Sequence, residues 1–115
     1  MFRDSTLSEN ISMWDVSSVP SMDYMFKKVR NFNANISWWD VSSVTSMYAM
    51  FHDTNSFNGD ISGWDVSSVT NMGAMFYTAN PFNHELCWDV GSKNTNEMFE
   101  RGVGGKIGCP PSYPH

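Results

Sequence analysis

The sequence predicts an α/β repeat solenoid, a right-handed coil of roughly four to five turns with short parallel strands on one face and short helical or 3₁₀ segments on the other. Two observations carry this prediction. The hexapeptide Trp-Asp-Val-Ser-Ser-Val begins at Trp14, Trp39 and Trp64, so its copies are 25 positions apart. The pair Met-Phe recurs at nearly the same spacing, at 1–2, 25–26, 50–51, 75–76 and 98–99. A fixed period of this size indicates units that bury their apolar faces against one another.

The repeat divides the chain into a solenoid over residues 1–99 and a Gly/Pro-rich C-terminal cap or tail over 100–115. The units run over about 1–24, 25–49, 50–74 and 75–99, and the last one lacks a residue on each side of Trp88. Met1 already belongs to the Met-Phe position, so we expect the chain to be a piece of a longer array. The alternative is an exposed first turn that associates end to end with other copies.

Each unit is expected to contain a strand and a helical segment. Ile61, Trp64 and Val66 have the L-x-x-L-x-L spacing of leucine-rich repeats, which predicts a short strand with Trp and Val inward and Asp outward. The segment from Val69 to Phe76 has helical or 3₁₀ spacing and is predicted to cross the opposite side. The predicted core consists of Trp14, Trp39, Trp64, Trp88, Val16, Val41, Val66, Met25, Met50, Met75, Phe26, Phe51 and Phe76.

The aspartate that follows each tryptophan has two interpretations. Asp65 precedes Ser67 by two residues, where its carboxylate can accept backbone N–H bonds as the chain turns, and we favour this role. A calcium ladder is the alternative, but calcium takes about six to eight oxygens and one column of carboxylates supplies too few. We therefore expect no metal and no cofactor.

Composition argues against several classes of function. The chain has 7 Lys and Arg against 12 Asp and Glu, a net charge of −5, so nucleic acid is not an expected partner. No apolar stretch approaches the roughly 20 residues of a membrane span, and no signal peptide is visible. The segment from His84 to Trp88 begins like a zinc-protease motif but ends in Trp where the second His is needed. We expect no enzymatic activity.

The outward positions next to the predicted strands form a candidate binding face, comprising Met13, Trp38, Asp15, Asp40, Asp65 and Asp89. Trp38 is the one aromatic residue at its position in the repeat, and an outward indole beside carboxylates suits contact with a peptide or a sugar ring. The alternative is a surface tryptophan that covers Met13 in the adjacent turn.

The two cysteines, Cys87 and Cys109, both lie outside the regular part of the repeat. A disulfide between them would contribute ~3 kcal/mol in the chain-entropy model and would fasten the tail over the last unit. Two free thiols are the alternative in a cytosolic protein.

The unit Phe-Asn-x-x-Ile-Ser-x-Trp-Asp-Val-Ser-Ser-Val-Thr-x-Met-x-x-Met-Phe closely resembles the 25-residue repeat of BspA-like leucine-rich-repeat surface proteins, a type also described in mycoplasma lipoproteins. The resemblance covers about residues 1–99 and implies an extracellular or surface-attached protein, linked in some members to adhesion and without catalytic residues. We therefore expect a non-catalytic adhesion or protein-binding module that meets an unknown protein or glycan at a surface. A glycan-binding or cell-wall structural element is the alternative, and ice binding by the rows of Ser and Thr is a third.

Overall fold

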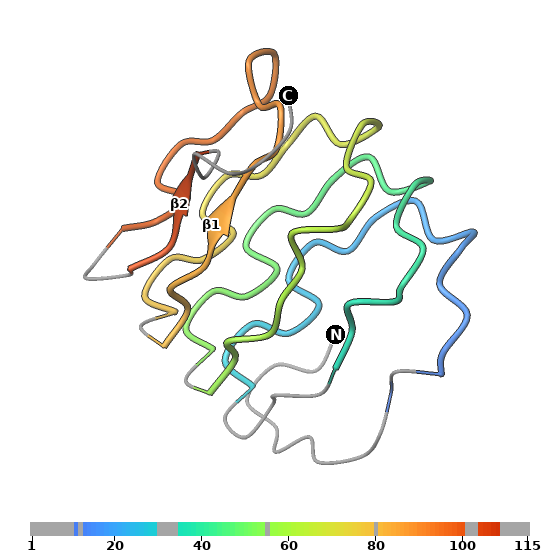
Figure 1. The fold of residues 1–115 in the computed structure, drawn as a ribbon, viewed down its shortest axis with the longest axis horizontal. Coiled ribbons are helices and arrows are strands. Elements are labelled where there is room, and N and C mark those ends of the chain that lie inside the picture. The colour runs from blue at the N-terminus through green and yellow to red at the C-terminus, as the bar shows by residue number, and fades with distance from the viewer. Residues whose placement is uncertain are drawn as a thin grey trace.

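The repeat units lie side by side in the order of the sequence. A computed structural model describes residues 11, 13–29, 35–54, 56–79, 81–100 and 104–108. In Figure 1 the units follow one another from blue to orange. Parallel β-bridges link equivalent positions of neighbouring units, namely Ser21 with Ser46, Ser46 with Asn71, and Asn71 with Asn94. We call such a set of equivalent positions a column.

Each unit is a succession of tight turns closed by hydrogen bonds between residues three apart. In the second unit, the N–H of Trp39 donates to the carbonyl of Ile36 at 3.1 Å, and the N–H of Val44 donates to the carbonyl of Val41 at 2.9 Å. The same bonds recur in the next unit at the equivalent residues. Local turn chemistry therefore shapes the backbone of the unit.

The predicted leucine-rich-repeat-like solenoid is wrong. The described residues contain no helix, and their only strands are β1 (Glu85–Leu86) and β2 (Lys106–Ile107), which pair in parallel in one small sheet (Figure 1). The radius of gyration is 13.1 Å and the molecule measures 37 × 32 × 25 Å. A compact body built from turns replaces the predicted coil with a strand face and a helical face.

The predicted strand at Trp64-Asp65-Val66 does not form because its polar groups close turns. The N–H of Trp64 donates to the carbonyl of Ile61 at 3.1 Å, and the side chain of Asp65 accepts the N–H of Ser67 at 3.1 Å. An aspartate that bonds to its own backbone two residues on offers the chain a turn in place of a ladder.

The predicted helical segment from Val69 to Phe76 is likewise a series of turns. Ala74 has a φ of 53°, whereas an α-helix needs negative φ at every residue. Alternate N–H groups also donate to the next unit, at 2.7 to 2.9 Å; the pairs are Met72 to Asn94, Ala74 to Asn96, and Phe76 to Met98. Because every second donor bonds outside its own segment, the helical ladder cannot form.

The core lies between the units and contains two rows of stacked phenylalanines. Phe51 stacks on Phe26 at 5.8 Å and on Phe76 at 5.4 Å, measured between ring centroids. Phe57 of the second row stacks on Phe51 at 4.3 Å and on Phe82 at 6.0 Å. Each fully buried ring contributes roughly 1.5–3 kcal/mol of hydrophobic stabilisation.

One residue predicted for the core is exposed. Trp14 keeps 41% of its surface accessible, whereas the other predicted core residues are buried. Trp39 and Trp64 each use the preceding unit, because their indole N–H groups donate to the carbonyls of Ile11 at 3.1 Å and Ile36 at 3.0 Å. No described unit precedes Trp14 to cover its ring in the same way.

The described part of the tail folds back on the last unit. Ile107 in β2 pairs with Leu86 in β1 and packs against the hydrophobic core. Gly105 lies so close to Phe82 that a Cβ atom there would come within 2.6 Å of the ring. Cys87 takes part in a disulfide, and Cys109, its predicted partner, lies outside the described residues.

Candidate functional site

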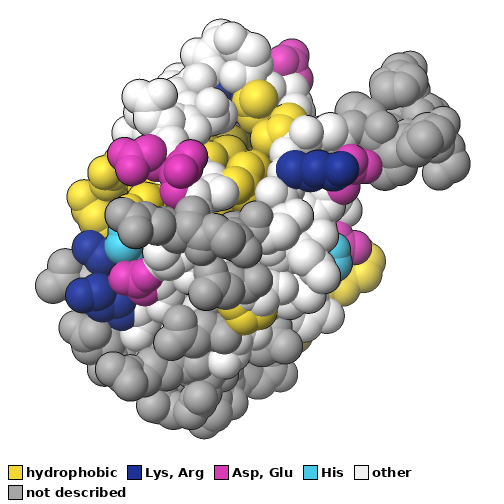
Figure 2. Space-filling view, turned by 90° about the vertical axis from the view of Figure 1, so that its left-hand side faces the viewer, with side chains coloured by type: hydrophobic (Ala, Val, Ile, Leu, Met, Phe, Trp, Pro, Cys, Tyr) yellow, Lys and Arg dark blue, Asp and Glu magenta, His cyan; other side chains and the backbone are white. Residues whose placement is uncertain are grey.

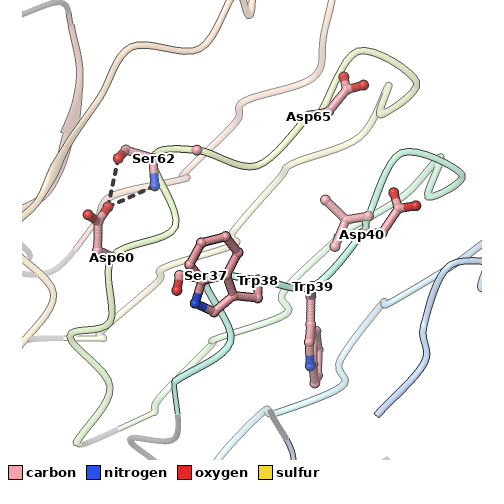
Figure 3. Close-up of a pocket in the computed structure, with 9 residues that line it drawn as sticks. Ser37, Trp38, Trp39, Asp40, Asp60, Ser62 and Asp65 are labelled. Carbon is pink, nitrogen blue, oxygen red and sulfur yellow. Dashed lines mark hydrogen bonds between the residues drawn. The ribbon is translucent and has the colours of Figure 1, made fainter. Parts of the chain in front are cut away.

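An open groove lies around Trp38, between two neighbouring units (Figure 3). Its volume is about 500 Å³, and its lining includes Trp38, Asp40, Asp60, Ser62, Gly63 and Asp65. Gly63 holds in its unit the position that Trp38 holds in the unit before. A Cβ atom at Gly63 would meet no atom within 4 Å, so the space beside the indole is open because this residue has no side chain.

The two adjacent tryptophans of this unit have opposite environments. Trp39 is 5% exposed and bonds to the preceding unit, whereas Trp38 is 86% exposed. In Figure 3 the two rings point in different directions from the same turn. The turn from Ile36 to Trp39 places one ring in the core and presents the other to solvent.

Trp38 does not shield Met13 from solvent, because Met13 is 85% exposed. An indole with this much exposed surface is unusual, since burial of an aromatic side chain is favourable whenever a neighbour allows it. The ring is therefore available to an external partner.

The carboxylates of the groove are held by local hydrogen bonds. Oδ1 of Asp60 accepts the N–H of Ser62 at 3.0 Å and its hydroxyl at 2.7 Å. Asp40 makes the same two bonds with Ser42 at 3.0 and 2.5 Å. Both bonds lower the pKa of each carboxyl below its ordinary value, and the bond from the serine hydroxyl is the larger cause. The groove therefore carries ionised carboxylates at neutral pH.

The other aspartates of the predicted binding face also accept local hydrogen bonds, but they differ in how many they accept. Bonds from the hydroxyl and N–H of Ser17 lower the pKa of Asp15, and those of Ser67 lower the pKa of Asp65. Asp89 accepts one N–H, from Gly91 at 3.2 Å, because glycine has no hydroxyl. These are the local bonds expected from the Asp-x-Ser spacing.

The groove combines predicted residues with others that the sequence analysis missed. Trp38, Asp40 and Asp65 line it, whereas Met13, Asp15 and Asp89 are not among its lining residues. Asp60 and Ser62 also line it and were not predicted. Their spacing repeats that of Asp65 and Ser67 five residues earlier, which is the signal that could have identified them.

In the part of the chain that the structure describes, no three His, Cys, Asp or Glu side chains lie close enough to hold a metal ion. No helix among the described residues has the length and apolarity needed to cross a membrane. His84 contacts the Asn58 carbonyl through Nε2 at 2.9 Å.

Comparison with known proteins assigns the chain to a family. Neither the curated proteins nor the solved structures contain a match. A family described as "Mycoplasma protein of unknown function, DUF285" matches residues 1–104, which includes all four units and the start of the tail. The chain therefore belongs to the DUF285 family of mycoplasma proteins.

Proposed function

We propose that this protein is a non-catalytic interaction module that binds a protein partner through the groove at Trp38. The observation that carries the proposal is the 86% exposure of Trp38 beside an open groove of about 500 Å³. Tryptophan is among the residues that most often dominate the energy of a protein interface, because a partner can bury its large rigid ring at low entropic cost.

The charges of the groove favour a basic partner. Asp40, Asp60 and Asp65 line the groove together with the indole, and hydrogen bonds from serine lower the pKa of each so that it is ionised at neutral pH. The whole chain has a net charge of −5. A partner segment that combines an apolar side chain for Trp38 with Lys or Arg for the carboxylates fits this arrangement, because complementary charges guide the encounter and fix the register.

An extracellular or cell-surface location belongs to the same proposal. The resemblance of the repeat to that of BspA-like surface proteins supports it.

Glycan binding at the same groove is the second candidate. The ring of Trp38 offers a flat apolar face, and the carboxylates that line the groove can accept hydrogen bonds from sugar hydroxyls. Ice binding has less support. The hydroxyls of Thr45 and Thr70 donate to carbonyls of the preceding unit at 3.1 and 3.2 Å, so they are engaged within the protein.

The test compares Trp38→Ala with Met13→Ala, which removes an equally exposed apolar side chain outside the groove. Phage-displayed peptides are selected on the wild-type protein, and a glycan array is probed in parallel. We expect basic peptides with an aromatic or aliphatic residue, whose affinity falls by about tenfold or more in Trp38→Ala and is kept in Met13→Ala. Peptide binding that is unchanged in Trp38→Ala contradicts the proposal. Binding to glycans on the array that is lost in Trp38→Ala favours the glycan alternative.

A further inference from the structure

A second hollow lies in the turn region that follows each bridge, and the repeat itself creates it. Its floor consists of Ala49 and Ala74, which occupy the same column in neighbouring units. Tyr24 and Glu97 hold that column in the units on either side and close the two ends. All four residues have φ between 53° and 60°, so the backbone conformation is the same in each unit. The two middle units have small alanine side chains where the outer units have Tyr and Glu. We call this hollow of about 270 Å³ the tyrosine trough.

One wall of the tyrosine trough is the ring of Tyr48. The ring lies against Gly73 of the next unit, where a Cβ atom would come within 3.1 Å of two ring carbons. Glycine at this position lets the ring lie close to the backbone. Tyr24 meets Tyr48 edge to face, with ring centroids 5.5 Å apart and an interplanar angle of 79°.

The opposite wall is formed by His52 and Tyr77, which belong to one column and stack at 4.8 Å with an interplanar angle of 14°. Lys27 continues this column, and its ammonium lies 5.3 Å from the ring centroid of Tyr24. The walls therefore combine aromatic surface with phenol, imidazole and ammonium groups.

The tyrosine trough has no net charge at neutral pH. Lys27 and Glu97 are its two charged lining residues and lie in different units. Burial lowers the pKa of His52, and Nδ1 lies 3.3 Å from a carboxylate oxygen of Asp53 without hydrogen-bond alignment. A neutral imidazole has one donor and one acceptor. Figure 2 shows one face of the molecule, on which basic and acidic side chains lie together beside a histidine.

Size and chemistry together select the class of ligand. A volume of about 270 Å³ equals roughly nine water molecules at about 30 Å³ each, which suits one small ring. Lys27 and Glu97 carry opposite charges, so the lining does not select a simple anion or a simple cation over a neutral ligand. A neutral ring with several hydroxyl groups uses both the aromatic walls and the mixed donors and acceptors. We propose that the tyrosine trough binds a neutral hexopyranose, either free or at the end of a glycan.

The decisive variant is Ala74→Gln, whose longer side chain is expected to occupy the volume of the tyrosine trough. Tyr24 and Glu97 show that the same column accepts long side chains at the same backbone angle, so the variant is expected to fold. Methyl glycosides of glucose, mannose and galactose are titrated and followed by protein NMR. We expect one of them to bind with a dissociation constant on the order of 1 mM. Ala74→Gln should weaken this binding by about tenfold or more.

Two further variants make the outcome unambiguous. Tyr77→Phe removes one hydroxyl and keeps the stacked ring, and we expect it to weaken binding by about threefold. Trp38→Ala should leave the affinity unchanged, because no residue of the Trp38 groove lines the tyrosine trough. Failure of the protein-binding proposal therefore does not affect this one.

The source of the sugar is read from a glycan array. Retention of glycans that end in the bound sugar identifies a terminal residue, and binding of the methyl glycoside alone identifies the free sugar; both support the proposal. The proposal is overturned if no glycoside shifts the spectrum, if binding survives in folded Ala74→Gln, or if tetramethylammonium or inorganic phosphate binds at the trough in place of the sugars.

Discussion

The segment 60–79 and the equivalent segment 85–100 at the end of the array carry the same motif, but the tryptophans of the two segments bond differently. The indole N–H of Trp64 donates to the carbonyl of Ile36 at 3.0 Å, whereas the indole N–H of Trp88 is buried without a partner. One residue fewer separates Trp88 from Ile61, which holds the place of Ile36. The difference shows that this bond is set by the register between two units and is not a property of the motif alone.

The last unit also replaces apolar contacts with polar ones. The N–H of Lys93 donates to the carbonyl of Val90 at 3.0 Å, and the N–H of Val69 makes the equivalent bond to Val66 in the unit before. The side chain of Val69 is buried in the core, whereas Lys93 has a charged side chain at this position. The ammonium of Lys93 instead donates to the carbonyl of Val69 at 2.6 Å. The middle unit is thus held by neighbours on both sides, and the last unit is held by one neighbour and the tail. The predictions that follow test this difference in order of expected effect.

The largest effect is expected from Phe51→Ala compared with Phe99→Ala. Phe51 is fully buried and stacks on rings of both neighbouring units, and its loss should lower the free energy of unfolding by about 3–5 kcal/mol. Phe99 is partly buried and stacks on Phe76 at 5.2 Å, so we expect roughly half that cost. Urea unfolding measures both. Equal costs would show that the end of the array is packed as firmly as its middle.

A smaller effect is expected where the tail covers the last unit. Gly105→Ala places a Cβ atom within 2.6 Å of the Phe82 ring and should cost about 1–3 kcal/mol. Gly63→Ala is the matched control, since a Cβ atom there meets nothing within 4 Å, and we expect a change within about 0.5 kcal/mol. The same unfolding measurement applies. A neutral Gly105→Ala would contradict the close packing of tail and unit.

The indole bond itself is tested by Trp64→Phe and Trp88→Phe. Both variants lose ring volume, but only Trp64→Phe also loses a hydrogen bond, after which the Ile36 carbonyl keeps the N–H of Trp39 as its one remaining donor among the described bonds. We expect Trp64→Phe to be the more destabilising of the two by about 0.5–1.5 kcal/mol. If Trp88→Phe costs as much, register does not control this bond.

The sequence predicts the columns well and the backbone poorly, for a physical reason. Equal spacing in each unit puts Phe51 and Phe76 at equivalent places, and the same bridges that join the units bring the rings together. Apolar spacing alone cannot separate strand or helix from turns, because the turn depends on a carboxylate such as Asp65 and on left-handed φ at Ala74. An alanine in the sequence does not indicate a left-handed φ, because alanine usually adopts negative φ.

The sites show the same limit. Trp38 could be predicted because a large residue interrupts its column. Asp60 was not predicted, although its spacing to Ser62 is that of Asp65 to Ser67 and indicates a second turn. The tyrosine trough was missed because small residues make it, and the absence of a side chain at Ala49 or Ala74 becomes a feature only when larger neighbours stand around it.

The smallest expected effect concerns the serine that distinguishes Asp65 from Asp89. The hydroxyl of Ser67 donates to Asp65 at 2.6 Å and is the first cause of its lowered pKa. A carboxyl with a lower pKa in the folded chain stabilises the fold above its ordinary value of 3.8, and this contribution is lost as the pH falls further.

Ser67→Ala gives the middle unit the single N–H bond of the last one, so its melting temperature at pH 7 should fall by about 1 °C or less, since the site is exposed. The variant should also lose less melting temperature than the wild type between about pH 5 and pH 3. Ser68→Ala, an exposed neighbour, serves as the control. An identical acid response in all three proteins would mean that the hydroxyl bond does not favour the ionised carboxylate, and that the two units differ by register and packing alone.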